Sequence, residues 1–131
     1  MQARKILIVD KDPKARQRLA DFFQKSNYQV DTTGSAAFLV AHIIKKNQPI
    51  VLLGSSFEEK ISPAEVVTLL RECNKYLHII LISDANSPKM LRKVREKGIF
   101  YHALKPQCRE DEEELRSVVE CALNDLGAAL I

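Results

Sequence analysis

Short apolar segments alternate along the chain with longer stretches in which apolar positions recur every three or four residues. The segment Lys5–Val9 is almost wholly apolar, as expected of a strand that is buried on both faces of a sheet. Asp12 and Pro13 then favour a helix start, because Asp caps free amides and Pro fits the first helical turn. Leu19 and Phe23 follow at helical spacing and predict the buried face of that helix.

The same alternation continues to the last helix, which the pattern predicts to begin near Glu110. The strands are predicted at Lys5–Val9, Tyr28–Asp31, Pro49–Leu53, His78–Ile82 and Phe100–Leu104. Strict alternation with helices predicts an α/β fold, a doubly wound parallel sheet with helices on both faces. Such sheets bind their ligands at the carboxyl ends of the strands. The residues at those ends are Asp10, Gly54, Ser83 and Lys105.

Length and composition describe one ordinary globular domain. The chain has 131 residues, of which 46% are hydrophobic and 28% charged, and these values suit a single core. The net charge of +3 is too small to indicate nucleic-acid binding. No apolar run approaches the roughly 20 residues of a membrane span, and Asp10 ends the first run too early for a signal peptide. We therefore expect a single domain over residues 1–131, in the cytoplasm, without direct contact to nucleic acid or membrane.

Four short motifs lie in order at the predicted strand ends. They read ILIVDKDP at 6–13, QPIVLLG at 48–54, IILIS at 79–83 and GIFYHALKP at 98–106. Together they resemble the CheY-like receiver domain of response regulators, the phosphorelay proteins of two-component signal transduction. The resemblance covers nearly the whole chain and implies the flavodoxin-like strand order 2-1-3-4-5. The protein would then either stand alone or form the N-terminal domain of a longer regulator.

The motifs depart from the family pattern where the family reaction takes place. Gly54 stands where the resemblance places the phosphate-accepting Asp, and Lys11 stands at the second acidic position. Asp10, Ser83 and Lys105 match the remaining pocket positions. Gly54 has no nucleophile, and Lys11 would repel Mg²⁺, which prefers carboxylate ligands. We expect a degenerate pocket that holds no cofactor. Mg²⁺ binding should be weak or absent, and Asp10 is the one weak candidate for a metal ligand.

A buried strand-end acid needs a partner for its charge. We expect Lys105, Lys11 or both to pair with Asp10 in place of a metal. The alternative is that Ser83 and Lys105 survive as a pocket for an anion. The resemblance further implies that the peptide bond between Lys105 and Pro106 is cis.

The resemblance also assigns an output face, formed by the fourth helix, the fifth strand and the fifth helix. His102 takes the position of the family's switch aromatic, either as a pH-responsive side chain or as an exposed polar residue. A basic fourth helix and an acidic start of the fifth helix could pair across a two-fold axis. The candidate residues of this face are Arg92, Arg95, Tyr101 and Glu112.

These observations are compatible with three functions. The first is a pseudo-receiver, an interaction module rather than an enzyme, which acts without aspartyl phosphorylation. Its partner would be a histidine kinase, an output domain or another regulator, and it could form a homodimer through the output face. The second is a sensor that binds a small ligand or anion in the vacated pocket. The third is a phosphorylatable receiver with a shifted acceptor such as Glu58 or Glu59, against which Gly54 argues.

Overall fold

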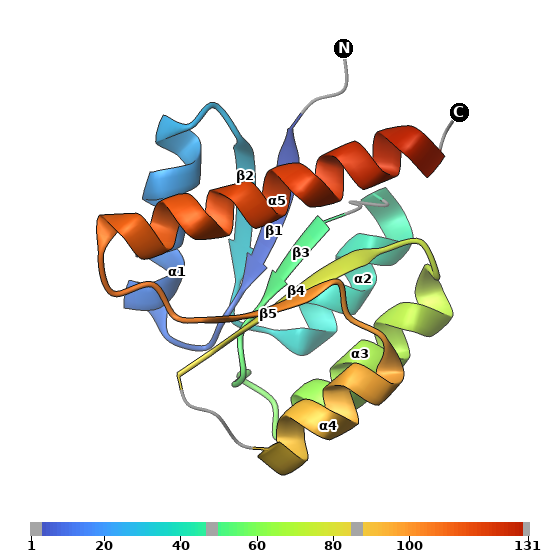
Figure 1. Cartoon of the computed structure of the whole chain (residues 1–131). Helices are drawn as coiled ribbons and strands as arrows, with labels where there is room; N and C mark the ends of the chain where they lie inside the picture. The colour runs from blue at the N-terminus through green and yellow to red at the C-terminus, as the bar shows by residue number, and fades with distance from the viewer. Residues whose placement is uncertain (1–3, 47–49, 85–87, 130–131) are drawn as a thin grey trace.

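Five parallel strands form the centre of the structure, in the order β2-β1-β3-β4-β5 (Figure 1). The computed structural model describes residues 4–46, 50–84 and 88–129. The strands are β1 (Lys5–Val9), β2 (Gln29–Thr33), β3 (Ile50–Leu53), β4 (His78–Ser83) and β5 (Tyr101–Leu104). The helices are α1 (Pro13–Lys25), α2 (Ala36–Lys46), α3 (Pro63–Cys73), α4 (Pro88–Lys97) and α5 (Arg109–Ala129). The predicted alternation and strand order are confirmed.

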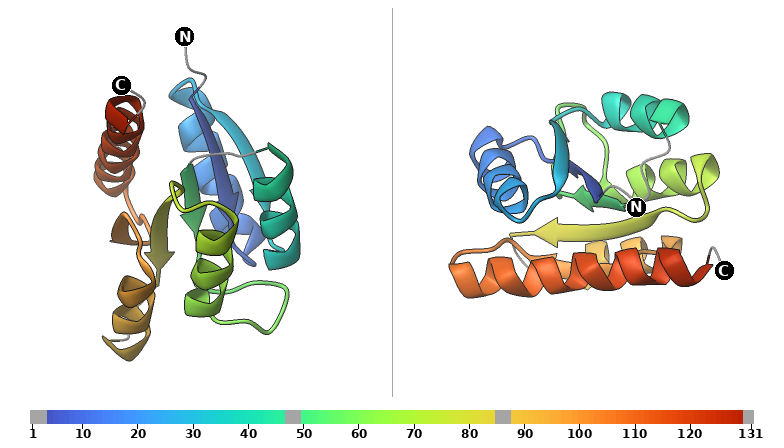
Figure 2. Two further views of the ribbon diagram at one scale, coloured as in Figure 1. Left: turned by 90° about the vertical axis from the view of Figure 1, so that its right-hand side faces the viewer. Right: turned by 90° about the horizontal axis from the view of Figure 1, so that it is seen from above.

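The side chains of the central strands alternate between two cores. Leu7 and Val9 of β1 face the layer formed by α2, α3 and α4. Ile6 and Ile8 of the same strand face α1 and α5 on the other side of the sheet. Figure 2 shows the sheet between these two helical layers. Both faces of the central strands exclude water, which explains why these strands are continuous apolar runs in the sequence.

The helices begin and end at the residues that the local sequence favours. Asp12 caps α1 by accepting a hydrogen bond from the amide of Lys14 at 3.0 Å. Ser62 and Glu65 form a capping box at the start of α3. Gly98 follows α4 with a φ of 92°, a conformation that glycine adopts without strain. Within the described ranges, no helix is long and apolar enough to cross a lipid bilayer.

The edge strands differ most from their predicted bounds. β2 runs over Gln29–Thr33 rather than Tyr28–Asp31, because Tyr28 packs its ring against Phe23 before the strand begins. β2 is polar and lies at the sheet edge, so its pattern carries little burial signal. Pro49, the predicted first residue of the third strand, lies outside the described residues.

Candidate functional site

The four residues that the sequence singled out meet at the carboxyl edge of the sheet. Asp10 follows β1, Gly54 follows β3, Ser83 ends β4 and Lys105 follows β5. They come together because parallel strands end at the same edge. Asp10 is only 3% exposed and Ser83 only 1% exposed, so the polar groups of both need partners inside the protein.

The carboxylate of Asp10 lies directly above Gly54. A Cβ on Gly54 would lie 2.8 Å from Cγ and Oδ2 of Asp10 and 2.8 Å from the carbonyl oxygen of Val9. Oδ1 of Asp10 accepts a hydrogen bond from the amide of Asp12 at 2.9 Å. The backbone of Gly54 is held close to β1, because its amide donates to the Val9 carbonyl at 2.6 Å. The space in which an acceptor side chain would begin is therefore filled by Asp10.

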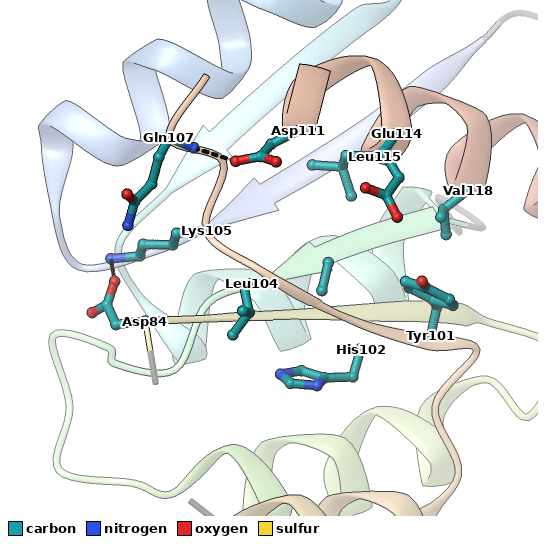
Figure 3. Close-up of a pocket in the computed structure, with 11 residues that line it drawn as sticks. Asp84, Tyr101, His102, Leu104, Lys105, Gln107, Asp111, Glu114, Leu115 and Val118 are labelled. Carbon is teal, nitrogen blue, oxygen red and sulfur yellow. Dashed lines mark hydrogen bonds and ion pairs between the residues drawn. The ribbon is translucent and has the colours of Figure 1, made fainter. Parts of the chain in front are cut away.

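Lys105 lies between two carboxylates. Its Nζ is 3.6 Å from Oδ2 of Asp10. The same Nζ is 3.1 Å from Oδ1 of Asp84 (Figure 3). Burial lowers the pKa of Lys105, but the hydrogen bond to Asp84 and the charges of Asp10, Asp84 and Asp12 outweigh it and raise the pKa overall. Lys105 therefore keeps its charge, and the predicted pairing with Asp10 is present in the structure.

Lys11 takes no such position. Its side chain is exposed, and its backbone amide donates to the carbonyl of Ser56 at 3.0 Å. Of the two lysines proposed as partners of Asp10, Lys105 is the one that the structure places beside the carboxylate.

The donor set does not fit a Mg²⁺ ion. Asp10 is paired with an ammonium group, Gly54 offers no carboxylate, and the carboxylate of Asp12 caps α1. Mg²⁺ requires near-octahedral oxygen ligation. In the described ranges, no group of three or more His, Cys, Asp or Glu side chains could hold a metal ion.

Ser83 and His102 are hydrogen-bonded to each other. Oγ of Ser83 lies 2.8 Å from Nε2 of His102, which joins the end of β4 to the middle of β5. His102 is half-buried, and its burial, followed by the nearby charge of Arg95, lowers the pKa of its imidazole. The side chain of His102 is thus engaged with Ser83 and not fully exposed to solvent.

The peptide bond between Lys105 and Pro106 is trans. The described residues contain no cis peptide bond, so the expectation of a cis bond here is wrong. The trans form is the lower-energy isomer of an X-Pro bond by about 0.5–1 kcal/mol. Lys105 reaches both carboxylates with this trans bond.

The residues assigned to the output face do not all lie together. Arg92, Arg95 and Tyr101 are exposed on α4 and β5. Glu112 is only partly exposed, and its carboxylate lies 3.7 Å from Nε of Arg18 on α1. Its place in this face is a correction to the sequence-based assignment. Other acidic residues of α5 accompany Tyr101 in a groove of about 490 Å³ along β5, namely Asp111 and Glu114 (Figure 3).

The contacts of two acidic residues in the site region were not predicted from the sequence. Asp84 directly follows β4, and its exposed carboxylate is the one closest to Lys105; the strand-end position was a usable signal. Glu59 was treated only as a shifted acceptor, yet its carboxylate accepts hydrogen bonds from the amides of Ala36 and Ala37 and from the hydroxyl of Ser35. These bonds lower the pKa of Glu59 to about 2. Glu59 therefore caps α2 from the loop that follows β3.

Comparison with known proteins agrees with this fold. Residues 6–120 match the family model of the response regulator receiver domain. A CheY-like receiver domain protein from Methanospirillum hungatei superimposes with a TM-score of 0.82 at 16% identity, over 95% of this chain and 99% of that one. A chemotaxis response regulator of Vibrio cholerae gives a TM-score of 0.79 at 20% identity, over 90% and 99% of the two chains.

A third structure extends the same likeness. The N-terminal domain of a response regulator/sensory box/GGDEF 3-domain protein from Carboxydothermus hydrogenoformans gives a TM-score of 0.83 at 19% identity, over 97% and 99% of the two chains. At these identities the structures establish a common fold. A search of curated protein sequences finds no match.

Proposed function

Because the chain belongs to the response regulator receiver domain family, we propose that it is a receiver-like signalling module that acts through protein contacts without aspartyl phosphorylation. Receiver domains are signalling modules, and we infer that this one is not an enzyme. We expect it to work in the cytoplasm, with a histidine kinase, an output domain or another regulator as its partner.

The observation that carries the proposal is the position of Asp10 over Gly54. An acceptor must present a carboxylate to a phosphoryl donor, and Gly54 presents none. The room for a replacement is taken by the Asp10 carboxylate, 2.8 Å from where a Cβ would lie. Glu59, an alternative acceptor, is held at the amino end of α2 by three hydrogen bonds. These contacts support a pocket that does not take a phosphoryl group.

Lys105 supports the same proposal and weakens the rival reading of an anion sensor. Its ammonium already faces Asp84 at 3.1 Å and Asp10 at 3.6 Å. An incoming anion would have to displace two carboxylates from Lys105. The local charge of two carboxylates and one ammonium is negative, which repels an anion rather than attracting it.

The partner surface that we propose is the family's output face, reduced to the exposed residues of α4 and β5. Arg92 and Arg95 supply positive charge there, and Tyr101 supplies an exposed aromatic ring, a residue type enriched at interfaces. The groove beside Tyr101 carries the acidic residues Asp111 and Glu114. Basic and acidic groups side by side would suit a two-fold homodimer as well as another regulator.

Amide NMR spectra would test whether the pocket responds to a phosphoryl mimic. We expect no saturable shifts at Asp10, Ser83 or Lys105 when Mg²⁺ and beryllofluoride are added together. Incubation with acetyl phosphate should leave the mass of the protein unchanged. Saturable shifts at these three residues, or a mass increase of one phosphoryl group, would refute the proposal.

The matched control is the double variant Lys11→Asp, Gly54→Asp, which supplies both missing carboxylates. A phosphorylatable receiver domain measured in parallel establishes that the reagents are active. Amide shifts in the double variant, together with no shifts in the wild type, would show that the substitutions at positions 11 and 54 account for the lost response to the phosphoryl mimic.

A further inference from the structure

The outer face of α2 is apolar. Phe38 is 50% exposed and Ile44 is 67% exposed, and Ala37 and Ala41 are exposed between them. The segment 36–44 contains no Asp, Glu, Lys or Arg. A surface helix normally turns polar residues to water, and a gathered apolar face marks a contact with another molecule.

The inner face of α2 holds these outer residues in place. Leu39 and Ile43 are buried in the core beside the sheet, so the helix has a single orientation. The ring of Phe38 stacks on that of buried His42, with centroids 5.8 Å apart and planes 28° apart. Phe38 is thereby restrained before any contact forms, which reduces the entropy that association would lose.

Opposite charges lie near the two ends of α2. Lys45 is exposed at the carboxyl end of α2. At the amino end lies Glu58, which is exposed and whose amide donates to the carbonyl of Gly34 at 2.8 Å. An 11-residue helix is about 16 Å long, so Lys45 and Glu58 lie near opposite ends of α2.

We propose that the outer face of α2 binds the same face of a second copy of this chain, with the two helices antiparallel. A two-fold axis between antiparallel helices brings Lys45 of each copy to Glu58 of the other, whereas parallel helices would place like charges together. The outer residues Ala37, Phe38, Ala41 and Ile44 are uncharged, so these side chains do not repel their own copy. Ala37 and Ala41 allow close approach, because helix separation depends on the side chains at the contact.

The association is weak and depends on concentration. One short helix supplies less than the roughly 800 Å² per partner of a standard stable interface. The surface is separate from the output face, because α3 lies between α2 and α4 in the same layer (Figure 2). Self-association through α2 does not depend on the state of the pocket, so it stands or falls independently of the proposed function.

Sedimentation velocity from about 10 µM to about 1 mM, the range for small interfaces, measures the association. We expect reversible dimers whose dissociation constant rises at least about tenfold for Phe38→Glu, since a central aromatic residue dominates small interfaces. Leu69→Glu is the matched control, because Leu69 is a large apolar residue, 42% exposed, on α3. Circular dichroism confirms that both variants remain folded.

Charge reversal tests the antiparallel geometry without touching the apolar residues. Lys45→Glu and Glu58→Lys should each weaken self-association, and the double variant should recover it. An equimolar mixture of the two single variants should form mixed dimers more tightly than either variant alone, because every cross contact then joins opposite charges.

Four results would overturn the proposal, and the first three concern α2 itself. The wild type could remain monomeric throughout the range, Phe38→Glu could behave like Leu69→Glu, or the mixture could associate no better than its components. Dimers that are lost with Leu104→Glu on β5 and unaffected by Phe38→Glu would place self-association on the output face. That last result would refute the α2 contact and leave the proposed function standing.

Discussion

A single methyl group tests whether Asp10 has taken the acceptor's place. In Gly54→Ala the new Cβ would lie 2.8 Å from Cγ and Oδ2 of Asp10 and from the carbonyl oxygen of Val9. Favourable contacts between carbon atoms lie at about 3.5–4.0 Å, so the neighbours must move. The Val9 carbonyl belongs to a central strand and accepts a hydrogen bond from the Gly54 amide, which limits the movement of this carbonyl.

The expected loss of stability follows from two opposing effects. Adding a methylene-sized group to a well-packed interior costs about 1–3 kcal/mol. Gly54 does not share the positive φ of Gly98, so alanine is compatible with its backbone. Replacing such a glycine stabilises by about 0.4–1 kcal/mol through the unfolded chain. The two ranges leave a net loss of about 0–2.6 kcal/mol in the free energy of unfolding, and the three contacts at 2.8 Å favour the upper part of it, about 1–2.6 kcal/mol.

Urea unfolding followed by circular dichroism would measure this loss in a double-mutant cycle with Asp10→Ala. Removing the carboxylate removes part of the clash, so Gly54→Ala should destabilise the Asp10→Ala protein less than the wild type. A remainder should persist from the Val9 carbonyl. The reasoning is refuted if Gly54→Ala is as stable as the wild type, or if its effect is the same in both backgrounds.

Three further substitutions probe the groups around the pocket and the α2 cap. Lys105→Met should lower the free energy of unfolding by about 2 kcal/mol, because it leaves the buried Asp10 carboxylate without its ammonium partner, and unchanged urea unfolding would contradict this. The lowered pKa of His102 means that the unfolded chain binds more protons below pH 6.5, so stability falls as the pH decreases from that value towards the folded pKa. His102→Gln should flatten this part of the pH–stability curve, and an identical slope in both proteins would refute the assignment. The pKa of Glu59, about 2 when folded against 4.5 as the reference, gives stability that is present above pH 4.5 and lost as the pH falls towards 2. Thermal unfolding between these pH values should show a smaller acid-induced fall for Glu59→Gln, and an equal fall would contradict the cap.

Strand ends that follow continuous apolar runs were predictable from the sequence. Lys5–Val9 is the predicted first strand and the observed β1, so Asp10 was placed correctly at its end. Burial of both sheet faces makes such runs unambiguous, and parallel geometry then gathers their ends. These two rules were enough to predict that four residues lie together at the sheet edge: Asp10, Gly54, Ser83 and Lys105.

Side-chain directions around the site were not predictable in the same way. Glu112 was assigned to the output face, but helical rotation turns it towards Arg18 on α1. Glu59 lies in an irregular loop, where no periodicity indicates that its carboxylate reaches the amino end of α2. These contacts depend on tertiary placement, whereas sequence patterns report only local burial.

The departures from the receiver pattern depend on one another physically. Without a side chain at Gly54, the Asp10 carboxylate can lie against the glycine, where Lys105 reaches it. A carboxylate restored at position 54 alone would meet Asp10 at contact distance. Lys105, already shared between Asp10 and Asp84, would then face three carboxylates, and the guanidinium of Arg16 is already bound to the carbonyl oxygen of Asp10, to which its Nη1 donates at 2.8 Å. Recovery of phosphoryl chemistry therefore requires further positive charge. A divalent cation could supply it only if an acid also replaced Lys11, since the present donor set does not fit the ion. The ion pair with Lys105 thus offsets the charge of the Asp10 carboxylate without a metal, and a single reversion at Gly54 would disturb this pairing.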